Sequence, residues 1–271
     1  MRVAVTGATG LVGRFFLRGF AAAGHRVETL PGWRLGRPAP LEGCAALVHA
    51  AFAHVPGRYR GGEGDDPDRF VALNRDGSLQ LFQDARAAGV GQVVFLSSRA
   101  VYDALPAGTP LPDGTPAAPA SLYGRVKAET EAGLAALDAE GFATASLRAT
   151  GIYGPGEGHK WTSLFADYLA GRPVAPRVAT ELHGDDLSAA ILLVLRNDAR
   201  GAFNASDLAL DRHDLLAEVQ RLTGCPHPPP PRADSAVSVM TCARLTALGW
   251  RPGGRAKLRD SLPDMLSLGG F

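Results

Sequence analysis

The chain has 271 residues and carries 28 Lys and Arg against 27 Asp and Glu, which gives a formal net charge of +1. This balance argues against a nucleic-acid partner, and no apolar run approaches the roughly 18 residues that cross a bilayer, so no membrane partner is expected. Three scattered cysteines exclude a disulfide scaffold and a zinc ribbon, and strand-like sequence from Arg2 leaves no room for a signal peptide. We therefore expect a cytoplasmic globular protein.

Strand-like and helix-like segments alternate over the first 150 residues. Short apolar runs predict strands at 3–6, 25–30, 45–50, 92–97 and 144–147, and apolar positions at helical spacing predict helices at 11–23, 68–88 and 121–139. This alternation is typical of an α/β fold with a Rossmann-like, doubly wound parallel sheet. Only about 14 residues separate the second strand from the third, whereas a β-α-β unit needs roughly 30. Strand 3 of the usual sheet is therefore expected to be missing.

After residue 150 the pattern is looser. We expect helices at 161–169, 186–195, 211–222 and 258–266 and a short strand at 201–205, with Asp211 as a helix N-cap. The chain is accordingly divided into a Rossmann domain over 1–150, which also receives later segments near 180–206, and a small C-terminal lobe over 151–271.

A glycine-rich turn, TGATGLVG at residues 6–13, joins the first strand to the first helix. Gly7 permits the tight turn, Gly10 lets the backbone approach a pyrophosphate, and Gly13 lets the helix pack closely on the strand. The free N–H groups at the start of the helix then face the anion. The turn predicts a dinucleotide-binding site that includes Gly7, Thr9, Gly10, Leu11, Val12 and Gly13.

The second strand ends without the acidic residue that usually holds the adenosine ribose. Pro31 occupies that place, and Arg34 and Arg37 follow it. Because arginine can hold a 2′-phosphate, the sequence favours NADP over NAD, with both left open. The alternative is that both arginines are solvated side chains of a surface loop.

Tyr123 and Lys127 are four residues apart and lie on one face of the predicted helix. A nearby ammonium favours the phenolate form of tyrosine, whose ordinary pKa of about 10 makes it a poor base at neutral pH. Ser98, at the carboxyl end of a predicted strand, can donate to the same substrate oxygen. Such a tyrosine–lysine pair is common by chance, but together with the glycine turn it predicts proton transfer at an alcohol or carbonyl.

With these residues in place, the chain resembles the extended short-chain dehydrogenase/reductases, in their NAD-dependent epimerase/dehydratase branch. The matching motifs follow the family's order along nearly the whole chain: the turn at 6–13, LVHAA at 47–51, Asn74, VFLSSRAVY at 94–102, YGRVK at 123–127, LRATGIYGPG at 147–156, HGDDL at 183–187 and LGW at 248–250.

The resemblance implies a role for each matching residue. Tyr123 is the acid/base, Lys127 holds the nicotinamide ribose and lowers the pKa of the tyrosine, and Ser98 orients the substrate oxygen. It also assigns further residues to the cofactor site or to its support: Ala50, Ala51, Asn74, Ser97, Ala149 and Thr150. The implied chemistry is hydride transfer at a carbinol or carbonyl carbon of a sugar or nucleotide-sugar.

Three functions remain open from the sequence. The first is an epimerase or dehydratase, in which hydride transfer is transient. The second is a net NAD(P)-dependent dehydrogenase or reductase of a smaller sugar, sugar acid or other carbinol. The third is a non-catalytic dinucleotide sensor, against which the presence of both Tyr123 and Lys127 argues.

Two departures from the family favour a small substrate. Nucleotide-sugar enzymes often carry asparagine where this chain has Gly151, and arginine four residues before the histidine of the HGDDL motif, where it has Ala179. An arginine suits a diphosphate because of its planar fork.

The remaining features are weaker. The aspartates of the HGDDL motif are expected to open a helix, so no metal site is predicted. The loop over 54–66 is a candidate flap, or an ordinary surface loop. The resemblance implies a homodimer through the helices at 68–88 and 121–139.

Overall fold

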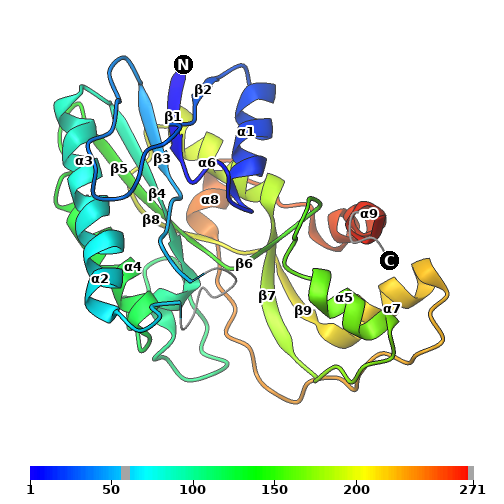
Figure 1. Ribbon diagram of the computed structural model, residues 1–271. Coiled ribbons are helices and arrows are strands. Elements are labelled where there is room, and N and C mark those ends of the chain that lie inside the picture. Colours follow the sequence, from blue (N-terminus) through cyan, green and yellow to red (C-terminus); the bar gives the residue numbers. More distant parts are fainter. Residues whose placement is uncertain (56–61, 268–271) are drawn as a thin grey trace.

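The computed structural model describes residues 1–55 and 62–267. At its centre is a six-stranded sheet in the order β2-β1-β3-β4-β5-β8, in which every pairing is parallel (Figure 1). Its strands are β1 (Arg2–Thr6), β2 (Arg26–Glu28), β3 (Ala46–His49), β4 (Gln92–Ser98), β5 (Ala143–Ala149) and β8 (Gly201–Ala205). The parallel α/β fold expected from the sequence is thereby confirmed.

Helices cover both faces of this sheet because its strands are apolar on both sides. One core cluster joins Val3 and Val48 to α1 (Gly13–Ala22) and α6 (Gly184–Arg196). The neighbouring residues Ala4 and Leu47 point the other way, into a second cluster with α3 (Gly77–Ala87) and α4 (Leu122–Ala135). Figure 1 shows these two helical layers on opposite sides of the sheet.

The strand β2 lies at one edge of the sheet and pairs with β1 alone. Within the described ranges no strand follows it at that edge, as the short connection to β3 predicts. The helix expected at 68–88 forms as α2 (Pro67–Val71) and α3, with a π-helical turn at Ala72–Asp76 between them.

A second, three-stranded sheet, in the order β6-β7-β9, is built from strands in the C-terminal half of the chain. It contains β6 (Gly151–Tyr153), β7 (Val178–His183) and β9 (Leu208–Asp211), and its core is closed by α5 (Thr162–Leu169), α7 (Arg212–Thr223) and α9 (Gly254–Ser267). The sequence did not predict these strands, nor the short α8 (Ala243–Ala247). The predicted N-cap is confirmed, since Asp211 Oδ1 accepts from the backbone N–H of His213 at 2.8 Å.

The described residues contain neither a membrane-spanning helix nor a cluster of metal-binding side chains. No helix in this part of the chain is both long enough and apolar enough to cross a membrane. No group of three or more His, Cys, Asp and Glu side chains gathers there in a metal-binding arrangement.

Candidate active site

The glycine turn packs directly on the end of β3. Gly7 has φ +71°, and a Cβ built on it would lie 2.7 Å from the backbone of Ala50 and Ala51. A Cβ on Gly13 would collide with the backbone of Ala8. Both positions therefore require glycine, the first for its conformation and both for close packing. Predicted cofactor residues from two separate segments, the turn and residues 50–51, are thus in contact.

The N-terminus of α1 opens onto this turn without a side-chain cap. Val12 stands at the N-cap and has no acceptor to offer, and no acidic residue lies in the first turn of this fully described helix. Leu11 and Val12 are half-buried, whereas Thr9 and Gly10 are exposed. The first N–H groups of α1 are consequently available to an anion.

Lys127 and Tyr123 project from α4 beside the carboxyl end of β4. Lys127 is 4% exposed, and its Nζ donates to the backbone carbonyl of Leu96 at 2.7 Å. The ammonium lies 4.4 Å from the ring centroid of Phe52 and 5.9 Å from that of Tyr123. Burial lowers the pKa of Lys127 to about 7, and Glu131, one helical turn further on, acts in the opposite direction.

Ser98 ends β4 at the same edge of the sheet and is paired with Ala149 of β5. Its Oγ accepts from the backbone N–H of Ala100 at 3.1 Å. Two neighbouring hydroxyls, those of Ser97 and Thr150, are buried without a hydrogen-bond partner among the described residues. Buried polar groups are normally paired, so orphaned hydroxyls at this edge suit a bound ligand.

Asn74 lies in the π-helical turn and fixes the segment that follows β3. Its Oδ1 accepts from the Ala53 N–H at 2.7 Å, and its Nδ2 donates to the carbonyls of Ala53 at 2.8 Å and Phe70 at 2.9 Å. The carboxamide is therefore committed to backbone, and Asn74 holds residues 50–53 in place. Interruptions of this type are frequent at functional sites.

His49, which is buried in the core, supports the same edge of the sheet. Its ring nitrogens lie 2.6 Å from Thr6 Oγ1 and 2.9 Å from Ser78 Oγ. Complete burial lowers the pKa of His49 to about 3, so the ring is neutral. It links β1 to α3, and Thr6 Oγ1 in turn accepts from the Ala51 N–H at 3.2 Å.

Arg34 and Arg37 are exposed in the segment after β2. Together with Glu28 and Trp33 they line a cavity of about 450 Å³. The prediction that β2 ends without an acidic residue was wrong in one respect, because the strand stops at Glu28 and not at residue 30, and the Glu28 carboxylate is paired with Arg2 at 2.9 Å. The backbone here is held by the Trp33 indole, which donates to the Arg37 carbonyl at 2.8 Å. Residues 56–61 of the candidate flap lie outside the described residues.

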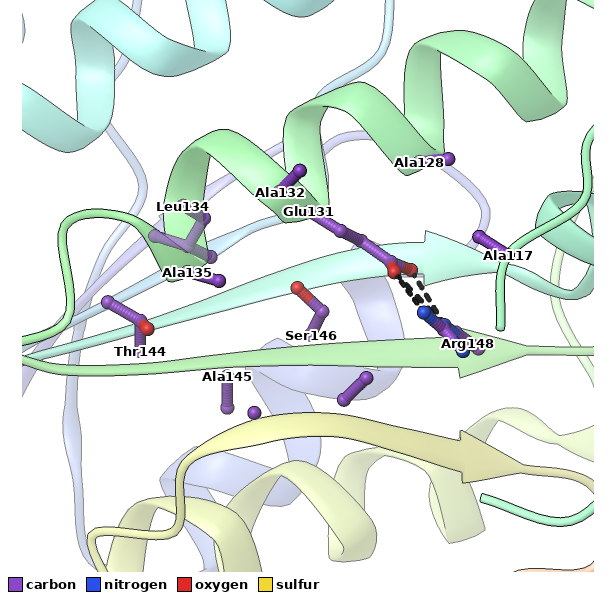
Figure 2. Close-up of a pocket in the computed structure, with 12 residues that line it drawn as sticks. Ala117, Ala128, Glu131, Ala132, Leu134, Ala135, Thr144, Ala145, Ser146 and Arg148 are labelled. Atoms are coloured by element: carbon purple, nitrogen blue, oxygen red, sulfur yellow. Dashed lines mark hydrogen bonds and ion pairs between the residues drawn. The ribbon is translucent and has the colours of Figure 1, made fainter. Parts of the chain in front are cut away.

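The sequence did not predict a buried network of polar side chains between α4 and β5. Arg148 of β5 forms an ion pair with Glu131 of α4 at 2.7 Å and also donates to the hydroxyl of Tyr102 at 2.6 Å. Figure 2 shows this pair at one side of a cavity of about 240 Å³ between α4, β5 and β8. Most of the cavity's lining on the sheet comes from the amino-terminal halves of β5 and β8. The available signal was an arginine, Arg148, directly after the strand predicted at 144–147.

Comparison with known proteins agrees with this geometry. The model of the NAD-dependent epimerase/dehydratase family matches residues 37–206, more than half of the chain. A 3-diazoavenalumate denitrifying reductase from a Streptomyces species is 29% identical over 93% of this chain and 96% of its own.

Two solved structures share the fold over almost their whole length. The Thermus thermophilus UDP-glucose 4-epimerase in complex with NAD has 25% identity and a TM-score of 0.75, with 98% of this chain and 99% of that one covered. RMD from Pseudomonas aeruginosa, complexed with NADPH, has 22% identity and a TM-score of 0.81 over 100% of both chains. The chain thus belongs to the NAD-dependent epimerase/dehydratase family and is an enzyme of the extended short-chain dehydrogenase/reductase type.

Proposed function

We propose that this enzyme is an NAD(P)H-dependent reductase of a small carbonyl compound. The observation that carries the proposal is the buried Lys127 ammonium, 5.9 Å from the ring of Tyr123, at the sheet edge that also holds the glycine turn. The carboxyl edge of a parallel sheet is where ligands of such folds bind.

The residues present fit a nicotinamide dinucleotide. The glycine cradle excludes side chains at Gly7 and Gly13, the start of α1 is uncapped, and the hydroxyls of Ser97 and Thr150 are orphaned within the described part of the chain. We assign the pyrophosphate to residues 7–13 and the nicotinamide half to residues near Ala149. When bound, this cofactor supplies the hydride.

The side chains of the chain itself manage the proton. Tyr123 donates its phenolic proton to the carbonyl oxygen as that oxygen becomes an alkoxide. Lys127 favours the phenolate that remains, because an ammonium in a dry site stabilises a nearby negative charge. Ser98 orients the same oxygen through its hydroxyl.

Net reduction of a small substrate is favoured by two observations. The full-length relative from Streptomyces is named a reductase. In addition, Gly151 and Ala179 offer no side-chain hydrogen bond to a diphosphate at the start of the small lobe, residues 151–271, in which we place the substrate.

A second candidate is an epimerase or dehydratase, which the Thermus UDP-glucose 4-epimerase supports at 25% identity. Its substrate would be a sugar or nucleotide-sugar. Cofactor that remains bound through purification would favour this candidate, whereas stoichiometric consumption of added NADPH favours the reductase.

The preference for NADP rests on Arg34 and Arg37, which line the cavity along β2. The structures that share the fold include one complexed with NADPH and one with NAD, so the choice depends on the two arginines. A cytoplasmic location and a homodimer through the layer of α3 and α4 complete the proposal.

The test is the substitution Tyr123→Phe, with Tyr168→Phe as the matched control. The Tyr168 hydroxyl donates to the His227 carbonyl at 2.6 Å, within the core of the small lobe. We expect Tyr123→Phe to lose at least about 100-fold in NADPH-dependent reduction of an aldehyde and ketone panel, while NADPH affinity is unchanged. The control should retain most of its activity. Wild-type protein that binds NADPH but reduces no carbonyl compound would exclude the reductase and leave the epimerase or dehydratase and the dinucleotide sensor.

A further inference from the structure

The first residue of β6 is covered by a pair of opposite charges. Lys160, in the loop before α5, forms an ion pair with Glu181 of β7, and Glu181 is paired in register with Gly151. A Cβ built on Gly151 would collide with both the Lys160 Nζ and the Glu181 Oε2. The pair therefore fills the volume that a side chain at position 151 would occupy.

This pair lies next to the reacting edge of the central sheet. Gly151 follows Thr150, whose buried hydroxyl has no partner among residues 1–55 and 62–267, and Ala149 is paired with Ser98. Neighbouring Cα atoms are about 3.8 Å apart, so Ala149 and Gly151 are within about 7 Å of each other. On β6 itself, the hydroxyl of Tyr153 is also buried and unpartnered in the described part of the chain.

The charges around Lys160 do not balance. Burial lowers the pKa of Lys160, the Glu181 carboxylate acts in the opposite direction, and the guanidinium groups of Arg177 and Arg212 lower the pKa further. Neither arginine forms an ion pair with any described residue, so three cations surround the single carboxylate of Glu181. The Lys160 side chain is still 27% exposed, whereas that of Glu181 is only 7% exposed. The excess is positive, and Lys160 has the more exposed side chain of the pair.

We propose that Lys160 anchors a carboxylate of the substrate, which competes with Glu181 for the ammonium, so that the enzyme reduces a compact carbonyl compound with a carboxylate a few bonds from the reacting carbon. This inference rests on the proposed reductase function and specifies its substrate class. A charge-assisted hydrogen bond from an ammonium is among the stronger polar contacts available to a ligand.

The probes are pyruvate and its neutral counterpart methyl pyruvate. Their binding to the NADPH-loaded enzyme is followed by saturation-transfer NMR, so that the test does not depend on turnover. We expect wild-type enzyme to prefer pyruvate by at least about tenfold. Lys160→Met should abolish this preference, and Lys160→Arg should keep it. The matched control is Arg172→Gln, which removes one positive charge from the same lobe at an exposed pair with Asp167.

The variant Glu181→Gln distinguishes a Lys160 that binds the substrate from a Lys160 that serves only in a structural ion pair. If Lys160 binds the substrate, removal of the competing carboxylate leaves pyruvate affinity equal or higher, even where the melting temperature falls. Four outcomes would each overturn the proposal. Pyruvate affinity could fall equally in Glu181→Gln and Lys160→Met, or the preference for pyruvate over methyl pyruvate could survive Lys160→Met. The wild-type enzyme could also bind neither probe, or bind dihydroxyacetone phosphate more tightly than pyruvate. Failure of the reductase function is distinct, since it would appear as loss of NADPH binding or of all carbonyl reduction in the wild-type enzyme.

Discussion

Burial of a lysine ammonium is energetically unfavourable, and Lys127 is buried where its charge can act on the reacting groups. It lies between the rings of Phe52 and Phe95, at 4.4 and 4.6 Å, with the Leu96 carbonyl as its hydrogen-bond acceptor. Burial lowers its pKa from 10.5 to about 7. The ammonium is thus poorly solvated and acts strongly on any negative charge that forms beside it.

Substitution of Lys127 should stabilise the protein while it removes activity. The unfolded chain keeps the lysine proton up to about pH 10.5, whereas folded Lys127 releases it near pH 7. Between these values the unfolded state binds more protons, so the free energy of unfolding rises with pH, and the penalty is largest below pH 7. We expect cofactor-free Lys127→Met to exceed wild type by on the order of 2 to 4 kcal/mol at about pH 6.

Urea unfolding of both proteins across the pH range checks this expectation. The difference should narrow steadily as the pH rises towards 10. A constant difference would mean that packing, and not the charge, accounts for the change in stability.

At the scale of elements, the position of α4 depends on one glycine. A Cβ on Gly124 would collide with the backbone carbonyl of Ala100, in the 3-10 turn at Arg99–Tyr102 that follows β4. The helix also begins at a cap that joins it to that turn, because Ser121 Oγ accepts from the Gly124 N–H at 3.0 Å and donates to Asp103 at 2.5 Å. The helix that bears Tyr123 is thereby fixed against the strand end that bears Ser98.

Gly124→Ala should therefore displace α4 and lower activity, with Gly133→Ala in the same helix as its control. A Cβ on Gly133 would meet only the end of the flexible Leu79 side chain, whereas Gly124 faces backbone. We expect Gly124→Ala to cost about 1 to 3 kcal/mol and to reduce kcat, and Gly133→Ala to stay within about 1 kcal/mol of wild type with normal kcat. Thermal melts and NADPH-dependent rates measure both. Normal activity in Gly124→Ala would show that the close approach of α4 is not needed.

The sequence predicted the features of the fold and of the candidate site that depend on residues close together in the chain. The turn at 6–13, the four-residue spacing of Tyr123 and Lys127, and the acidic first turn of α6, capped by His183, all depend on neighbours in the chain. The strands of the small sheet were missed because β6 has three residues, and β7 alternates only weakly with Ala179 and Glu181 in it. The ion pair of Lys160 with Glu181 joins residues that only the fold brings together.

At the scale of the molecule, the chain crosses between the two sheets several times. β6 starts two residues after β5 ends, and α6 and β8 return to the central sheet before β9 enters the small one. The segment at 103–120 is held across this architecture by polar contacts. Asp113 accepts from the Asn204 N–H on β8 at 2.9 Å and from the Arg244 N–H on α8 at 3.0 Å, and the Tyr102 hydroxyl donates to Asn204 at 2.9 Å.

Arg148 is the centre of this network, so its removal should destabilise the whole molecule. It pairs with Glu131, and it donates to the Tyr102 hydroxyl and to the Thr115 carbonyl at 3.1 Å. Arg148→Met leaves the Glu131 carboxylate buried without its cation, which should cost about 3 to 5 kcal/mol. The double variant Arg148→Met, Glu131→Leu removes both charges and should recover much of that loss, because a buried pair contributes little compared with apolar packing. Urea unfolding gives both values. If the double variant were as unstable as the single one, the contacts of Arg148 with Tyr102 and Thr115, and not the ion pair, would be what holds α4, β5 and the 103–120 segment together.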